Sequence, residues 1–243
     1  MTPGRHRVRA YWLGTLAYRP AWDLQRSLVA AVRAGEHPGA LLLLEHPHVF
    51  TIGRRGDGST LLWSQADCDR RGVEIVWTDR GGDATYHGPG QLVGYPILDL
   101  DGLRSDVLRH IRDLERSLIS YLHTVGIEAE PGGPGLTGVW SRGDKVAAIG
   151  VKLSRNVTSH GFALNLTTDL AIFNQGIVPC GLTGKRATSV LELGGPAVGV
   201  AEAAARYGGH FGECFGVDVE EADPAALAGL PAAVPEPAVL NVL

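Results

Sequence analysis

The chain of 243 residues is long enough to bury one sizeable hydrophobic core and has the length of an ordinary single domain. Apolar residues make up 44% and charged residues 20%, a balance that excludes a largely disordered chain. The net charge of −4 gives no reason to expect a nucleic-acid partner. The basic start MTPGRHRVRAYW lacks a following apolar segment, and no stretch approaches the roughly 18 apolar residues of a membrane span. We therefore expect a cytoplasmic protein without membrane insertion.

The cysteines and histidines argue against a metal or disulfide framework. Cys68, Cys180 and Cys214 are sparse and lack CxxC spacing, so we expect them to be reduced. His46 and His48 are separated by a proline, and no third ligand has convincing spacing. No metal site is predicted.

The first half of the chain alternates between short apolar segments and one helical pattern. Apolar residues recur at helical spacing after Pro20 as far as Val32, where Gly and Pro residues follow. Runs rich in β-branched, aromatic and apolar residues predict strands on either side of this helix. The predicted strands are Val8–Leu16, Ala40–Glu45, Val49–Gly53 and Val73–Thr78.

The second half has two clear helical patterns, which frame a predicted hairpin. The first helix is expected from Ser105, its N-cap, to Val125, and the second from Ala197 to Phe215. The hairpin has a glycine in its turn. Its strands are predicted at Leu136–Ser141 and Lys145–Leu153, and a further strand at Gly161–Leu166.

Strands outnumber helices and occur both in hairpins and between helices. This order favours an α+β (mixed α/β) fold, a mixed β-sheet with packed helices, over a doubly wound parallel sheet. We expect a single domain over 1–220. The segment 221–243 is rich in Ala and Pro and is expected to be a poorly ordered tail.

The densest unusual segment is RGGDATYHGPGQLVGYP, Arg80 to Pro96. Its glycines let backbone approach a ligand closely, and Arg80 and His87 offer donors for a polar or anionic group. A set of tight turns between two strands explains the same composition equally well. The segment matches neither GxGxxG nor the P-loop pattern.

Cys180 lies in IVPCGLTG, a loop that is able to expose a thiol. A free thiol has a pKa of about 8.5, so a nucleophilic Cys180 needs a neighbouring cation or base. On the sequence alone, a small buried hydrophobic side chain is the favoured interpretation of Cys180. Cys214, on an apolar helical stripe, is interpreted in the same way, and Cys68 as incidental.

The sequence has only Lys145, Lys152 and Lys185 as lysines, so a required lysine is easy to see. An acid–base role suits lysine and not arginine, because arginine keeps its proton. Lys145 and Lys152 are seven residues apart on one predicted strand, which places them on opposite faces of a regular pleat. For each of them, a solvated lysine at a strand end is the favoured interpretation. His160 and Gly161 begin SHGFALNL, which fits either the wall of an apolar pocket or ordinary sheet. No GxSxG elbow is present, so a serine hydrolase is not indicated.

Four segments in order, RGGDATYHGPGQLVGYP, KVAAIGVKLSR, HGFALNL and IVPCG, resemble the octanoyl-[acyl-carrier-protein]:protein N-octanoyltransferases of lipoate biosynthesis. The resemblance extends from about Val8 to Cys214. It implies the fold shared with the catalytic domains of lipoate and biotin protein ligases, and an acyltransferase that needs no cofactor. It implies octanoyl-acyl carrier protein as the donor. The implied acceptors are lipoyl domains of 2-oxoacid dehydrogenase complexes and the glycine cleavage H protein.

The resemblance also implies the site. The family pairs a lysine with the cysteine of the PCG loop, and the matching positions here are Lys145 and Cys180. The implied substrate-binding residues are Arg80, Gly81, Gly82, Asp83, Ala84, Thr85, Tyr86, His87, Ala148, Ile149, Gly150, Gly161, Phe162 and Ala163.

The implied reaction passes through an octanoyl thioester on Cys180, with Lys145 moving protons in both half-reactions. An ATP-dependent lipoate–protein ligase remains an alternative, because such ligases bind adenylate through their own Gly-rich loop. A non-catalytic binder of acyl carrier protein or lipoyl domains is a second alternative. Cys180 separates these hypotheses, since a ligase acts through an acyl-adenylate and needs no nucleophilic cysteine.

Overall fold

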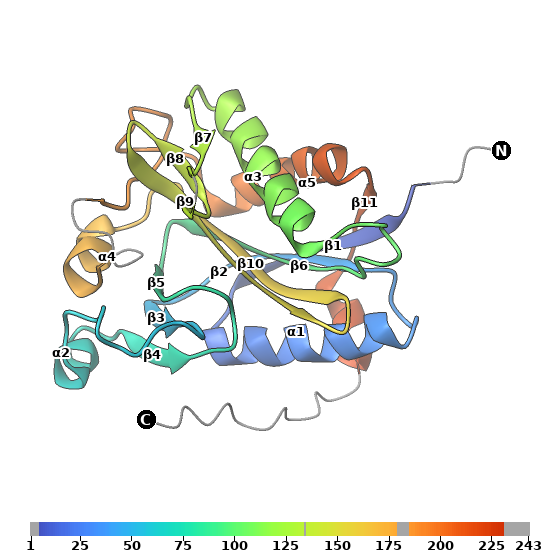
Figure 1. Cartoon of the computed structure of the whole chain (residues 1–243), viewed down its shortest axis with the longest axis horizontal. Coiled ribbons are helices and arrows are strands. Elements are labelled where there is room, and N and C mark those ends of the chain that lie inside the picture. The colour runs from blue at the N-terminus through green and yellow to red at the C-terminus, as the bar shows by residue number, and fades with distance from the viewer. Residues whose placement is uncertain (1–4, 134, 179–184, 231–243) are drawn as a thin grey trace.

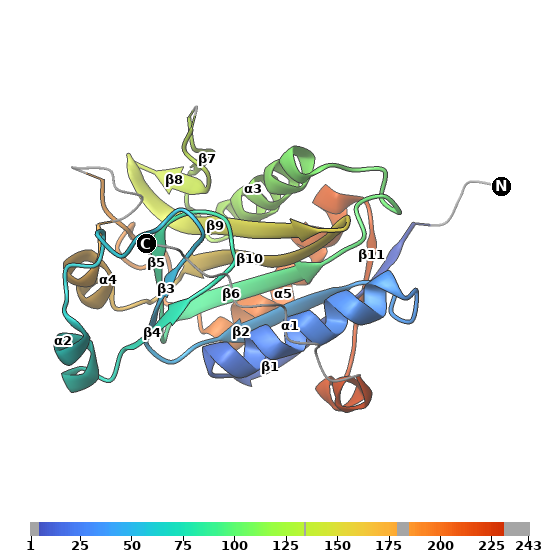
Figure 2. The same ribbon diagram turned by 60° about the horizontal axis from the view of Figure 1, so that its bottom comes forward.

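The computed structural model describes residues 5–133, 135–178 and 185–230. Its main element is an eight-stranded mixed sheet in the order β11-β1-β2-β6-β10-β9-β8-β7 (Figures 1 and 2). β11, β1 and β2 run parallel to one another, and the remaining neighbours pair antiparallel. The strands are β1 (Arg7–Thr15), β2 (Ala40–Glu45), β6 (Gln91–Ile97), β7 (Glu130–Pro131), β8 (Val139–Ser141), β9 (Asp144–Ser154), β10 (Val157–Asn165) and β11 (Asp218–Glu221).

Helices cover both faces of this sheet. α1 (Tyr18–Arg33) lies on one face, and α3 (Val107–Thr124) and α5 (Val200–Phe215) pack together on the other (Figure 1). β2 shows why the sheet needs both layers. Leu41 and Leu43 point into the core under α3 and α5, whereas Leu42 and Leu44 point into the core under α1. All four are buried, so the sequence of β2 is a continuous run of apolar residues and does not alternate between apolar and polar residues.

A smaller sheet of three strands, in the order β4-β3-β5, stands beside the main one. Its strands are β3 (Val49–Ile52), β4 (Glu74–Trp77) and β5 (Ala84–His87). The short helices α2 (Gln65–Arg70) and α4 (Leu170–Gly176) flank it (Figure 1). Its own core includes Phe50, Cys68, Tyr86 and Phe173. The expectation that Cys68 is incidental therefore does not hold, since its thiol is fully buried in this core.

The expected fold class, a mixed sheet with packed helices, is confirmed. The main difference lies in the segment Arg80 to Pro96, which contributes β5 and most of β6 and not turns alone. The cap of α3 also differs, because Asp106, and not Ser105, accepts the N–H of Arg109 through its side chain. In the part of the chain that the structure describes, no helix is both long enough and apolar enough to span a bilayer.

The segment after residue 220 contains regular structure in its described part. β11 ends at Glu221 and is paired with β1, and a 3-10 helix, η2 (Pro224–Gly229), follows. Leu227 of η2 is buried with the residues under α1. The folded unit therefore extends at least to Leu230, and residues 231–243 of the expected tail lie outside the described residues.

Candidate active site

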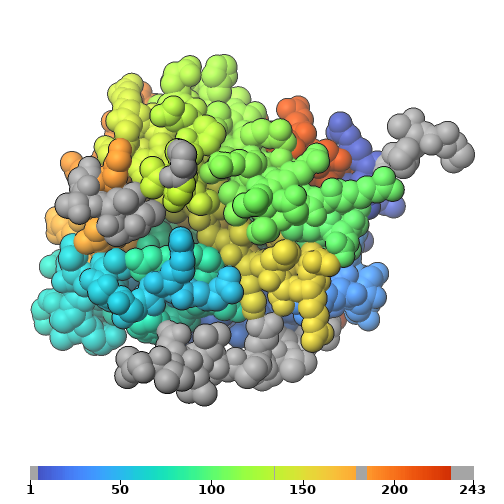
Figure 3. All heavy atoms as spheres, in the orientation of Figure 1, coloured from blue at the N-terminus to red at the C-terminus, as the bar shows by residue number. Residues whose placement is uncertain are grey.

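A cavity of about 700 Å³ opens between the β9–β10 hairpin, α3 and the Gly-rich segment that ends in β5. In the space-filling view, the yellow hairpin meets green α3 on one side and the blue to cyan residues of the smaller sheet on the other (Figure 3). The cavity combines an apolar side with a cationic side. Among the residues that the structure describes, the cations that line it are Arg54, Arg55, Arg80 and Lys145, and the one carboxylate is that of Asp83. A protein of net charge −4 therefore concentrates positive charge at this site.

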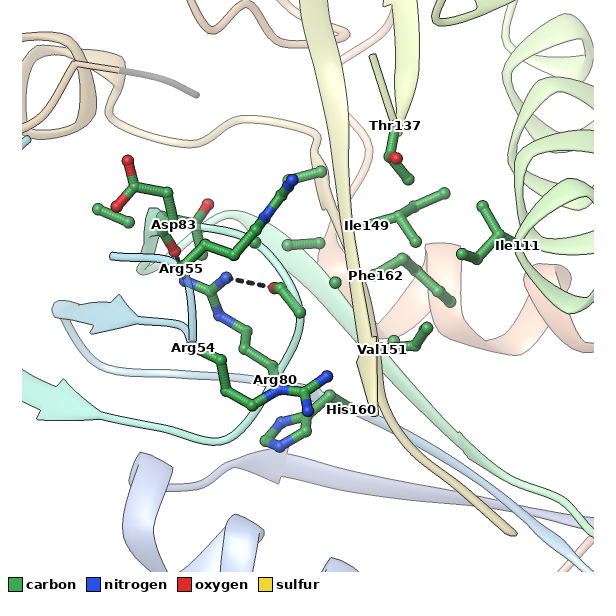
Figure 4. Close-up of a pocket in the computed structure, with 18 of the residues that line it drawn as sticks. Arg54, Arg55, Arg80, Asp83, Ile111, Thr137, Ile149, Val151, His160 and Phe162 are labelled. Carbon is green, nitrogen blue, oxygen red and sulfur yellow. Dashed lines mark hydrogen bonds between the residues drawn. The ribbon is translucent and has the colours of Figure 1, made fainter. Parts of the chain in front are cut away.

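The apolar wall is built by two strand segments that face each other across the hairpin. In the register of β9 and β10, Ala148 pairs with Ala163, Ile149 with Phe162, and Gly150 with Gly161. All six line the cavity. Ile111, which reaches in from α3, lies near Ile149 and Phe162 and extends this wall (Figure 4).

The Gly-rich loop rests directly on this wall. The Gly81 N–H donates to Val151 O over 2.9 Å, and a Cβ added at Gly150 would lie 2.8 Å from Gly81 O. Real Cβ atoms essentially never approach backbone so closely. Glycine at position 150 therefore lets the loop and β9 form adjacent walls of one cavity.

Arg80 braces the loop from inside. Its guanidinium donates to Thr51 Oγ1 and O, to Gly81 O and to Asp83 O, at 3.1, 2.5, 2.9 and 2.6 Å. The side chain is buried, and Figure 4 shows it between Arg54 and Arg55. Most of its N–H groups thus bond backbone carbonyls of the loop and Thr51 of β3. Arg80 therefore fixes the shape of the cavity in addition to contributing positive charge.

Asp79, Lys152 and His160 form a polar cluster beside the cavity. Asp79 accepts from Lys152 Nζ and from His160 Nε2, each over 2.7 Å. Burial alone would raise the pKa of Asp79, but its hydrogen bonds and opposite charges outweigh this and lower it well below the usual range. Burial lowers the pKa of His160, so the ring is neutral at pH 7 and Lys152 is the charged partner. Lys152 is therefore committed to Asp79.

Lys145 is the lysine that lines the cavity. Its side chain is buried, with Nζ 4.8 Å from the centre of the Trp140 ring. Its backbone pairs with the segment that follows residue 184, since Lys145 N donates to Arg186 O and Thr188 N donates to Lys145 O. Cys180 lies outside the described residues.

Three histidines that pack below the Gly-rich loop carry distinct hydrogen bonds. His46 Nδ1 donates to Leu16 O over 2.6 Å, which leaves Nε2 to accept from Tyr95. Burial lowers the pKa of His46 to about 4. His87 and His160 are equally buried and line the cavity. Over the described residues, no group of three or more His, Cys, Asp or Glu side chains is arranged to hold a metal ion.

The structure brings most of the expected substrate-binding residues to this one cavity. Tyr86 is the exception, because alternation along β5 turns it into the core of the smaller sheet. The sequence reasoning missed Tyr18, Arg54, Arg55, Tyr95, Ile111, Leu136 and Thr137 as lining residues. Apart from Tyr95, which lies near the end of the first motif, these residues lie outside the four motifs. Arg54 and Arg55 follow Gly53 directly, and this position after a predicted strand could have identified them.

Comparisons with known proteins identify the family of the chain. The family profile described as the lipoyl protein ligase A/B catalytic domain matches residues 17–212. An octanoyltransferase of Solibacter usitatus is 50% identical over 216 residues, 89% of this chain and 96% of that protein. An octanoyltransferase of Chloroflexus aurantiacus is 46% identical over 214 residues, 87% of this chain and 95% of that protein.

A solved structure shows the same fold at low identity. The bipartite lipoate protein ligase from Thermoplasma acidophilum, solved in a study with its E2 lipoyl domain, superposes with a TM-score of 0.69 at 19% identity. The match covers 91% of this chain and 90% of that one. The chain therefore belongs to the lipoyl protein ligase A/B catalytic domain family, and within it to the octanoyltransferases.

Proposed function

We propose that this protein transfers an octanoyl group from octanoyl-acyl carrier protein to a lysine of lipoyl domains, through a thioester on Cys180. The acceptors would be the lipoyl domains of 2-oxoacid dehydrogenase complexes and the glycine cleavage H protein, met in the cytoplasm. The observation that carries the proposal is Lys145, a buried lysine on the wall of a cavity whose other side is apolar.

Chain connectivity supports a partnership between Lys145 and Cys180. Ala187 pairs with Lys145 in a parallel bridge, and Ala187 also exchanges two hydrogen bonds with the Asn174 side chain. Ala187 follows Cys180 by seven positions, and an extended chain spans at most about 3.5 Å per residue. The length of this segment is therefore compatible with the proposed partnership between Cys180 and Lys145.

The apolar wall suits an acyl chain. If each of the eight carbons takes about the volume of one water molecule in the liquid, about 30 Å³, an octanoyl chain would fill roughly 240 Å³. The cavity of about 700 Å³ therefore has room for the chain and for part of the donor arm or of the acceptor lysine.

In the first half-reaction, the sulfur of Cys180 attacks the thioester carbonyl and the bond to the carrier sulfur breaks. Lys145 would accept the thiol proton of Cys180 and return it to the leaving carrier thiolate. In the second half-reaction, the acceptor amine attacks the Cys180 thioester and the bond to Cys180 breaks. Lys145 would take the proton that the amine loses and give it to Cys180, which restores the enzyme.

Conversion of a thioester to an amide is downhill and requires no ATP. An ATP-dependent lipoate–protein ligase is the alternative from the same fold, and a non-catalytic binder of carrier or lipoyl domains is the other. The two alternatives share one difference from the proposal, because in neither of them does the acyl group form a covalent bond to Cys180.

The test is mass spectrometry of the intact protein after incubation with octanoyl-acyl carrier protein and without ATP. We expect an adduct of about 126 Da that hydroxylamine removes and that a lipoyl domain consumes. Cys180→Ala should form no adduct, Lys145→Met should form it far more slowly, and Cys214→Ala should behave as the wild type. An enzyme that requires ATP and stays active as Cys180→Ala is a ligase, and a wild type that never forms the adduct is a binder.

A further inference from the structure

Two side-chain amides below the cavity have only one possible orientation. Asn165 lies 2.8 Å from Thr188 O, a carbonyl that accepts only, so Asn165 must present its Nδ2 there. Its Oδ1 then accepts from Gln91 Nε2 over 2.9 Å, and Gln91 Nε2 also donates to Tyr86 O over 3.1 Å. Both amide hydrogens of Gln91 are used, and its Oε1 is left to face His87.

This chain of hydrogen bonds determines which nitrogen of His87 carries the proton. His87 Nδ1 is 2.9 Å from Gln91 Oε1, an atom that accepts only, so Nδ1 must donate. Nε2 of the neutral ring is therefore unprotonated. Burial and the nearby charges lower the pKa of His87 well below its usual value, so the ring stays neutral at pH 7.

Nε2 of His87 is an acceptor for which the described part of the protein supplies no hydrogen-bond donor. His87 is only 5% exposed and lines the cavity, and no described residue bonds its Nε2. The ring is held rigidly, stacked on Tyr18 with centroids 5.8 Å apart and edge-on to His46 at 5.5 Å. An acceptor on a side chain that is held rigidly and lines a cavity is available to a donor from a ligand.

We infer that Nε2 of His87 accepts a hydrogen bond from the N–H of the incoming lysine amine and orients that amine for attack on the acyl-enzyme. This assignment rests on the proposed function, because it requires an acyl-enzyme for the amine to attack.

The chemistry of the cavity explains why an N–H group is the partner. Arg54, Arg55 and Lys145 line it with donors, whereas an attacking amine needs acceptors for the hydrogens that do not leave. His160, the other histidine of the wall, uses Nε2 on Asp79 and has Nδ1 at 3.4 Å from the Tyr18 hydroxyl. The lone pair of His87 Nε2 also repels anionic oxygen, which disfavours a carboxylate in this position.

In this assignment His87 accepts the hydrogen bond from the amine, and Lys145 transfers the proton. The charged and titratable groups that face His87 are His46, Arg80 and His160, with Tyr18 stacked on the ring and Lys145 among the residues that line the same cavity. The cationic neighbour and the burial keep His87 from holding a proton. His87 therefore stays an acceptor throughout, while Lys145 moves the proton. The hydrogen bond strengthens as the amine nitrogen gains positive charge, so it favours the transition state over the ground state.

The test separates the two half-reactions in the full-length enzyme. His87→Asn keeps a donor at the place of Nδ1 and removes the acceptor, whereas His87→Gln keeps an acceptor near the place of Nε2. We expect His87→Asn to slow transfer of the octanoyl group to a lipoyl domain about 10- to 100-fold more than it slows formation of the octanoyl-enzyme. His87→Gln should recover part of the transfer rate. His123→Asn, an exposed histidine on α3, is the matched control and should change neither step.

A second variant gives a readout that a purely structural role would not produce. Gln91→Glu places a carboxylate against Nδ1, which favours the doubly protonated ring and turns Nε2 into a donor. As the pH is lowered, transfer by this variant should fall more steeply than transfer by the wild type, and the difference should disappear as the pH is raised. Equal slowing of both half-reactions in His87→Asn, or a pH profile of Gln91→Glu parallel to that of the wild type, overturns the inference. Absence of the octanoyl-enzyme in the wild type refutes the proposed function instead.

Discussion

The side-chain amide of Asn174 and the backbone of Ala187 exchange two hydrogen bonds, with Nδ2 donating to Ala187 O over 3.2 Å and Ala187 N donating to Oδ1 over 3.0 Å. This pair ties the end of α4 to the residue that bridges Lys145. It therefore holds Ala187, which follows Cys180 by seven positions, at a fixed place beside Lys145 on the main sheet. Loss of the pair should loosen this attachment without altering either proposed catalytic side chain.

We predict that Asn174→Leu, which cannot make either hydrogen bond, lowers the free energy of unfolding by about 1–3 kcal/mol, because the buried polar groups of Ala187 lose their partner. Octanoyl-enzyme formation should slow by about tenfold, since Cys180 is less well placed. Urea denaturation and a single-turnover assay measure the two effects. The control is Gln175→Leu, which changes the exposed neighbouring residue on α4. If Asn174→Leu were acylated as fast as Gln175→Leu, the prediction would be contradicted.

Gly150 offers a test of the contact between β9 and the Gly-rich loop. Gly150→Ala would place a Cβ 2.8 Å from Gly81 O, so the loop must move away from the wall of the cavity. We predict that the rate of octanoyl-enzyme formation falls at least about tenfold, because a displacement of reacting groups by 1 Å or less is enough for an effect of this size. Gly209→Ala, where an added Cβ meets nothing within 4 Å, should instead stabilise α5 by about 0.5–1 kcal/mol and leave activity unchanged. Wild-type kinetics in Gly150→Ala would show that the contact does not shape the site.

Periodicity was sufficient for the elements whose apolar residues follow one spacing. The helix after Pro20, the helix that ends near Val125 and the buried run Ala40–Glu45 lie where the sequence predicts them, within about two residues. β5 and β6 were hidden because glycines and prolines dominate their segment, although the pairing of β6 with β2 and β10 tolerates them. Tertiary pairing overrides composition in this segment.

The site shows a similar division. The choice of Lys145 over Lys152 came from the resemblance. A physical argument for it is that Lys152 bonds Asp79, and these two residues are too far apart in the sequence for this bond to be predicted. His160 has a φ of 57°, a left-handed conformation that directs its ring to Asp79 and that no local pattern announces for a histidine. The protonation state of His87 depends on Asn165 and Thr188, which only the folded sheet brings together.

Asp79→Asn tests the energetic weight of the polar cluster. The side chains of Asp79 and Lys152 are only 12% and 16% exposed, so removing the negative charge leaves a mostly buried ammonium without this counter-charge. We predict a loss of about 3 kcal/mol in the free energy of unfolding at pH 7. The pKa of Asp79 is lowered in the folded state, so this contribution is present above the unfolded value of 3.8 and is lost as the pH falls further.

The stability difference between Asp79→Asn and the wild type should therefore shrink below pH 4 in urea titrations run at several pH values. Asp218→Asn, an exposed acid on β11, should show no comparable loss at pH 7. An Asp79→Asn protein as stable as the wild type at pH 7 would mean that the cluster contributes no net stability.

His110 gives the opposite prediction, because it is a buried polar side chain that stabilises nothing through hydrogen bonds. It is fully buried on α3 and packs edge-on against Phe215, with ring centroids 5.4 Å apart, and neither ring nitrogen bonds a described residue. His110→Leu keeps an apolar contact of similar size and removes two unsatisfied atoms. We predict that it raises the free energy of unfolding by about 1–2 kcal/mol at pH 7.

The effect should grow as the solution becomes more acidic. Burial lowers the pKa of His110 from 6.5 to about 4, so between these pH values the unfolded chain binds a proton that the folded protein does not. The wild type therefore loses up to about 3 kcal/mol at this one residue as the pH falls from 6.5 to 4, and His110→Leu does not. Urea denaturation at pH 7 and pH 5 measures the gain in the free energy of unfolding and its increase at the lower pH. The control is His123→Leu, at an exposed position of α3. A gain that is equal at the two pH values would show that the ring is charged or solvated in the native protein, whereas a gain that widens at pH 5 identifies a neutral, unpartnered imidazole in the core.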